Sequence, residues 1–89
     1  MISSFELLLN DALNKVADAI NRHERNEKAP LSIQALAQVK KELEEMIRVM
    51  DPKVYMPGYP RFIIDWPGED VLIKELVHVA ALYEKIRKS

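Results

Sequence analysis

The 89-residue chain is 48% hydrophobic and 30% charged, and its 13 lysine and arginine residues nearly balance 14 aspartate and glutamate residues, giving a net charge of −1. This balance provides no strong positive field for nucleic acid, and the absence of cysteine excludes disulfides and thiolate metal sites. A chain of this size predicts one domain with a single core, and dimerisation commonly supplements the stability of such small domains.

Neither a signal peptide nor a membrane-spanning segment is expected from the sequence. The N-terminus lacks a basic region followed by a long apolar run, and no stretch approaches the ~18 consecutive apolar residues of a transmembrane helix. We therefore expect a cytoplasmic protein with no membrane partner.

A first amphipathic helix is predicted over residues 4–27. Ser3 and Glu6 fit a capping box at its start, and apolar residues then recur at three- and four-residue steps on one face. Pro30 disfavours helical geometry at the residue before it, so the first connection is expected over residues 26–31.

A second amphipathic helix is predicted over residues 31–50. It begins either with Pro30 at its first helical position or with Ser32 as its N-cap. Its apolar stripe has coiled-coil-like spacing, and it ends at Asp51-Pro52 because proline cannot continue the helical hydrogen bonds. A short link between two such helices predicts an antiparallel hairpin.

The next segment differs in composition from the rest of the chain. From Pro52 to Asp70 the sequence concentrates four of the five prolines, both glycines, the only tryptophan and four of the six aromatic residues. Such a stretch is too rich in proline for a long helix and too apolar to remain in solvent. It must therefore fold against the helices or against a partner.

Residues 51–66, which we call the strap, are expected to follow an irregular, extended path across the helices. The alternative is a two-stranded ribbon of residues 54–56 and 61–64, joined by a type II turn centred on Pro57 and Gly58. We favour the extended path because type II turns match the twist of a hairpin poorly and an isolated ribbon is marginal in water.

A third helix is predicted over residues 67–87, with Pro67 in its first turn and the acids Glu69 and Asp70 at the positive end of its dipole. Its apolar residues cover roughly 200° of the helical wheel, more than one packing face needs. The helix is therefore expected to contact the strap and the hairpin together, or another subunit. The whole pattern predicts an all-α, three-helix domain spanning residues 1–89.

Glu75 lies inside the apolar arc of this third helix, where an unpaired carboxylate is costly. We expect it to pair with Arg61 or with another basic residue near the strap. Together with His78 it forms a Glu-x-x-His pair of the kind found in helical-bundle carboxylate metal sites. Such sites need a second pair, which the sequence lacks, so these two residues are only weak metal candidates and no cofactor is expected.

Acidic residues also cluster on the second helix, at Glu42, Glu44 and Glu45. With the acids of the third helix they could hold magnesium, which makes a metal-dependent phosphate-ester or nucleotide hydrolase the alternative function. The Glu-Glu-x-x-Glu and Glu-x-x-Asp spacings of small all-helical nucleotide pyrophosphohydrolases are absent. We therefore interpret the cluster as a solvated face with intrahelical ion pairs.

A second alternative, weak nucleic-acid binding, depends on three basic residues near the end of the first helix, Arg22, Arg25 and Lys28. Acidic residues are interleaved with these three, so we favour the interpretation that the basic residues compensate the helix dipole. His23 lies on the apolar side of the same helix. It could act as a ligand or general base, but closing the solvent end of the apolar seam is the interpretation we favour.

The strap carries the aromatic side chains Tyr55, Tyr59, Phe62 and Trp66. Aromatic residues are enriched at interface cores, and a proline-stiffened loop loses little entropy on binding. They could equally complete the core of the domain. We expect a small non-enzymatic interaction or regulatory module, homodimeric through the strap and the third helix.

Overall fold

The computed structural model describes residues 4–29, 31–64 and 70–86 of the chain. Within these residues it contains helices and no strand, which confirms the predicted all-α class. The four helices of the described part are α1 (Ser4–Glu24), α2 (Ile33–Val49), α3 (Pro60–Ile63) and α4 (Val71–Glu84). Three long helices were predicted, and the fourth, α3, is a short helix within the strap.

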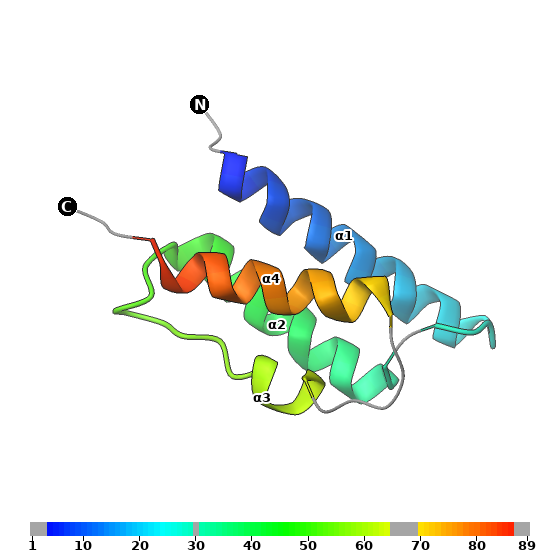
Figure 1. Cartoon of the computed structure of the whole chain (residues 1–89). Coiled ribbons are helices and arrows are strands. Elements are labelled where there is room, and N and C mark those ends of the chain that lie inside the picture. The colour runs from blue at the N-terminus through cyan, green and yellow to red at the C-terminus, as the bar shows by residue number, and fades with distance from the viewer. Residues whose placement is uncertain (1–3, 30, 65–69, 87–89) are drawn as a thin grey trace.

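The long helices pack side by side, with α1 and α2 antiparallel and α4 lying beside them (Figure 1). The strap leaves the end of α2, runs back along α4, and brings α3 against that helix (Figure 1). As a result, α4 contacts α1 on one side and the strap on the other. None of the described helices is both long and apolar enough to cross a membrane.

One hydrophobic core unites all four helices and the strap. The long helices contribute mainly aliphatic side chains, while the strap contributes one tyrosine ring and α3 one isoleucine. The largest side chains that are fully buried in this core are Leu9, Val16, Leu36, Val39, Leu43, Met46, Tyr59, Ile63, Leu76, Val79 and Tyr83.

Helix α1 ends at Glu24, earlier than the predicted boundary near residue 27. The cause is local, because Asn26 adopts the left-handed conformation with φ of 61°. Its N–H donates to the carbonyl oxygen of His23 at 3.1 Å, and the N–H of Glu27 donates to that of Arg22 at 2.8 Å. This is the Schellman pattern, which closes a helix.

Helix α2 begins with Ser32 as its N-cap, one of the two starts that the sequence allows. The Ser32 hydroxyl accepts a hydrogen bond from the N–H of Ala35 at 3.1 Å. At the other end Met50 has a left-handed φ of 51°, and its N–H donates to the carbonyl oxygen of Met46 at 2.8 Å. The helix therefore ends at Val49, one residue before the predicted end at residue 50. Pro30 lies outside the described residues.

The prediction that the strap is extended along its whole length is wrong, since a helical turn begins at Pro60. Proline suits the first position of a helix because its φ is already helical and its missing N–H has no partner to lose. The alternative ribbon does not form, because none of residues 54–56 and 61–64 is in a strand. The type II turn of this alternative is also absent, because the φ of Gly58 lies outside the left-handed range that this turn requires.

Helix α4 starts at Val71, whereas the sequence predicts a start at residue 67. Asp70 is its N-cap, with an extended backbone and a carboxylate that accepts a hydrogen bond from the N–H of Leu72 at 2.8 Å. Residues 65–69, where the earlier start is predicted, lie outside the described part of the chain. The arrangement confirms that the wide apolar arc of this helix serves two neighbours, α1 and the strap.

Candidate functional site

A buried carboxylate on α2 holds the strap in place. Glu42 is only 6% exposed, and its Oε1 accepts hydrogen bonds from the backbone N–H groups of Gly58 and Tyr59, the latter at 2.8 Å. Its Oε2 accepts a hydrogen bond from the side-chain amide of Gln38 at 2.6 Å. These three donors replace the water that the carboxylate loses on burial. We call the contact between Glu42 and the two strap N–H groups the strap anchor.

Tyr59 connects the strap to α4 as well as to α2. Its side chain is fully buried, and its hydroxyl donates a hydrogen bond to the carbonyl oxygen of Leu76 at 2.7 Å. Burial, and to a smaller degree the negative charge of Glu42, raises the pKa of the Tyr59 phenol. The hydroxyl therefore stays protonated at neutral pH and remains a donor.

The structure separates the aromatic residues that the sequence groups as a partner surface. Tyr59 belongs to the core, and Tyr55 is partly buried against it, where burial raises the pKa of its phenol. Phe62 is 37% exposed, and Trp66 lies outside the described residues. Of the three described rings, Phe62 is the one with a large exposed area.

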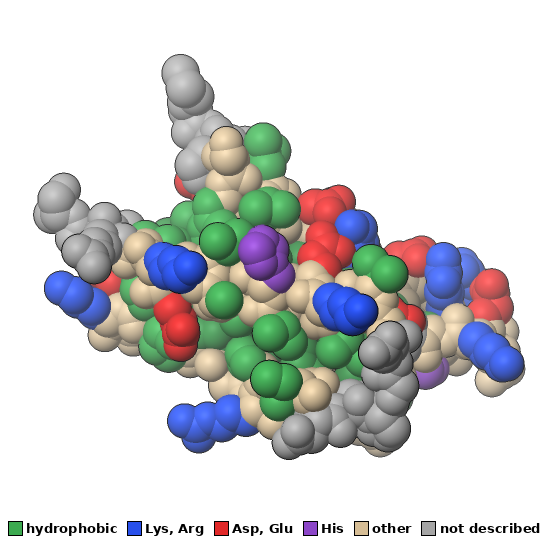
Figure 2. Space-filling view, viewed as in Figure 1, with side chains coloured by type: hydrophobic (Ala, Val, Ile, Leu, Met, Phe, Trp, Pro, Cys, Tyr) green, Lys and Arg blue, Asp and Glu red, His purple; other side chains and the backbone are tan. Residues whose placement is uncertain are grey.

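An apolar groove of about 200 Å³ lies between the strap and α4. Figure 2 shows apolar side chains gathered where α4 and α3 meet. Met56 is 44% exposed in this groove, and Ile64, which is 64% exposed, lies one helical turn after the groove residue Pro60. We define the strap–α4 surface as Ile64 together with the groove lining Met56, Pro57, Pro60, Val77, Ala80, Ala81 and Glu84.

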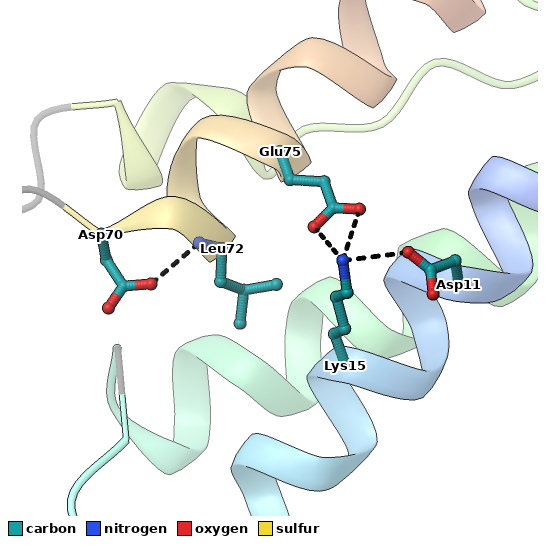
Figure 3. A network of polar contacts seen from close by, with 5 residues as sticks. All are labelled: Asp11, Lys15, Asp70, Leu72 and Glu75. Carbon is teal, nitrogen blue, oxygen red and sulfur yellow. Dashed lines mark hydrogen bonds and ion pairs between the residues drawn. The ribbon is translucent and has the colours of Figure 1, made fainter.

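Glu75 joins α4 to α1 on the opposite side of α4 (Figure 3). The Lys15 Nζ lies 3.1 and 2.9 Å from its two carboxylate oxygens, and 3.0 Å from the Asp11 Oδ2. The expectation that Glu75 needs a cationic partner is confirmed. The prediction that this partner is Arg61 or another basic residue near the strap is wrong, because the fold brings Lys15 of α1 to this carboxylate.

This ion network predicts a measurable shift in the titration of Asp11. The hydrogen bond from Lys15 holds the pKa of the Asp11 carboxyl below its ordinary value of 3.8. The contact therefore stabilises the fold above the unfolded pKa and loses its effect as the pH falls through the folded pKa. Replacing Lys15 with methionine should move the pKa of Asp11 upward when it is followed by NMR.

Lys28→Met provides the control for this titration, because Lys28 lies in the connection after α1 and not in the network. This variant should leave the pKa of Asp11 unchanged. An Asp11 pKa that is the same in Lys15→Met as in the unmodified protein would show that the network does not form in solution.

A second groove, of about 450 Å³, lies between α1 and the first turns of α4. Its charged side chains already have partners, since Lys15 bonds to Glu75 and Arg22 pairs with Asp18 at 3.1 Å. Asp70, at one end, caps α4. In the described part of the chain, no buried polar side-chain atom lacks a hydrogen-bond partner.

The two histidines are placed differently. The Nε2 of His23 lies 2.8 Å from the carbonyl oxygen of Leu31, a contact that links the end of α1 to the connection before α2. This bond fits the favoured interpretation, a histidine that closes one end of the apolar seam. His78 is exposed on α4. Among the described residues, no group of three or more histidine, cysteine, aspartate or glutamate side chains is arranged to hold a metal ion.

The basic residues near the end of α1 are partly neutralised within the chain. Arg22 pairs with Asp18, and Arg25 pairs with Glu27. Both arginines are thus engaged by neighbouring acids, in exposed pairs of the kind that contribute little to stability.

The strap anchor is the part of the site that the sequence does not reveal. The sequence places Glu42 beside the apolar stripe of α2, on a solvated face, and this prediction is wrong because Glu42 is buried. Glu45, by contrast, is one turn from Arg48 and pairs with it, as expected for that face. One signal was available, because Glu42 follows the stripe residue Val39 by three positions and precedes Met46 by four.

No family model, curated protein or solved structure matches the chain. The basis for a function is therefore the arrangement of its own residues. Its distinctive elements are the strap anchor and the apolar surface that the anchored strap forms with α4.

Proposed function

We propose that the protein is a small, cytoplasmic, non-enzymatic interaction module that acts as a homodimer through the strap–α4 surface. The observation that carries this proposal is the exposure of Met56 and Ile64 beside the groove, on a segment whose backbone is fixed by Glu42. Contiguous exposed apolar side chains in a soluble protein mark interaction sites.

The strap anchor supports this proposal through preorganisation. A loop that must be ordered on binding loses conformational entropy, and this loss weakens the complex. Here two backbone N–H groups are bonded to Glu42, and the Tyr59 hydroxyl is bonded to α4. The apolar side chains on either side of the anchor are thus presented by an already ordered segment.

Two properties of the whole chain favour a second copy as the partner. The domain is small, so its own core provides limited stability, and dimerisation buries further apolar area. The net charge of −1 also means that two copies repel each other little.

Sedimentation equilibrium at micromolar concentrations tests the proposal. The protein should behave as a dimer, and Ile64→Ser should raise the dimer dissociation constant by about tenfold or more, because it replaces an exposed apolar side chain of the contact with a polar one. The matched control is Leu7→Ser, which alters a similarly exposed aliphatic residue (59%) on α1. A monomeric unmodified protein, or equal weakening by the two variants, would contradict the proposal.

A further inference from the structure

Two charged side chains of opposite sign lie on the two segments that form the strap–α4 surface. Arg61 is exposed on α3, next to the groove residue Pro60, whereas Glu84 lines the groove from α4. Neither has an ion pair or a side-chain hydrogen bond within the described part of the chain. Other basic residues do pair with acids of the same chain, namely Lys15, Arg22, Arg25 and Arg48.

The position of Glu84 makes a cationic partner favourable. It is the last residue of α4, where the exposed carbonyl groups already give the helix end a partial negative charge. An added carboxylate at this end is unfavourable for the helix, and a cation brought close to it reverses that effect. The α4 wall of the groove therefore favours a positive group, while Arg61 gives the strap wall a positive charge of its own.

A two-fold axis is the symmetry that brings the charge on each wall of the groove opposite a charge of the other sign. In a symmetric dimer the same patch of each copy forms the contact, so residue i of one copy meets residue j of the other and the reverse contact follows. An axis that lies in the contact plane and runs between the two walls places the strap wall of one copy opposite the α4 wall of the other. Arg61 then faces Glu84 of the second copy, and the symmetry repeats the pair.

We infer that the homodimer is held in register by two such pairs, with Arg61 of each copy bonded to Glu84 of the other across the joined grooves. This inference rests on the proposed dimer and adds its orientation. The apolar side chains of the strap–α4 surface, among them Met56 and Ile64, are enclosed between the two pairs. The strap–α4 surface thus carries both the positive and the negative member of the pair. A surface that binds a second copy of itself must carry both.

Charge reversal tests the pairing. Arg61→Glu and Glu84→Arg should each raise the dimer dissociation constant at least tenfold at low ionic strength, because each creates two like-charge contacts. The double variant restores opposite charges at both contacts, so its dissociation constant should return to within a few-fold of that of the unmodified protein. Lys41→Glu, an exposed change on α2, should leave the dimer unaffected. Circular dichroism would establish that all four variants are folded.

The outcomes separate the inference from the proposal on which it rests. A monomeric unmodified protein would overturn both. A dimer that neither single reversal weakens would overturn the pairing and leave the homodimer in place. A dimer that both single reversals weaken and the double variant does not recover would also overturn the pairing, since both charges would then act through other neighbours.

Discussion

Replacing Tyr59 with alanine is expected to lower the free energy of unfolding by about 3 to 5 kcal/mol, because it removes a fully buried ring together with a buried hydrogen bond. Small domains have a total stability of about 5 to 15 kcal/mol, so the loss is a large fraction of the whole. Urea denaturation followed by circular dichroism would measure it.

Two conservative variants divide this effect into its parts. Tyr59→Phe keeps the ring and removes the hydroxyl that donates to Leu76, so it should cost about 1 kcal/mol. Tyr55→Phe removes the hydroxyl of a partly buried ring on the same strap, and we expect a change below about 0.5 kcal/mol. A Tyr59→Ala loss no larger than that of Tyr59→Phe would show that the ring does not pack in the core.

The long helices could be predicted because their signals are local. Apolar periodicity, the Ser32 cap and the Asp51-Pro52 stop each depend on residues within one or two turns. The same local reasoning did not indicate the end of α1, because the left-handed conformation of Asn26 competes with a helix that could have continued. The helical turn at Pro60 also went unpredicted, and it places the fully buried Ile63 in the core, a contact that the local sequence does not indicate.

The contacts of the candidate site were harder to predict because they join residues far apart in the sequence. The need of Glu75 for a cation follows from its position in an apolar arc, but its partner Lys15 is 60 residues away. Which basic residue reaches it depends on how α1 lies against α4. The strap anchor was equally hard to predict, because Glu42 accepts hydrogen bonds from backbone groups, which no side chain in the sequence marks.

Replacing Glu42 with alanine is expected to destabilise the protein by about 3 kcal/mol, since it leaves two strap N–H groups without their acceptor and each such loss costs about 1 to 3 kcal/mol. The loss of stability should be concentrated in the strap. Hydrogen exchange should therefore show faster exchange of the Gly58 and Tyr59 amides under native conditions, by a larger factor than for amides in the middle of α1.

Glu42→Gln and Glu44→Ala make this prediction specific to the carboxylate. Glutamine retains an oxygen that can accept both strap N–H groups, but it loses the charge and places a donor where Oε2 accepts from the Gln38 amide, so we expect a cost of about 1 to 2 kcal/mol. Glu44 is exposed on the same helix, and its replacement should change stability by less than about 0.5 kcal/mol. If Glu42→Ala were as mild as Glu44→Ala, the strap would be held by its other contacts, such as the buried side chains of Tyr59 and Ile63. The exposed side chains of the strap would then lose the preorganisation on which the proposed contact with a second copy depends.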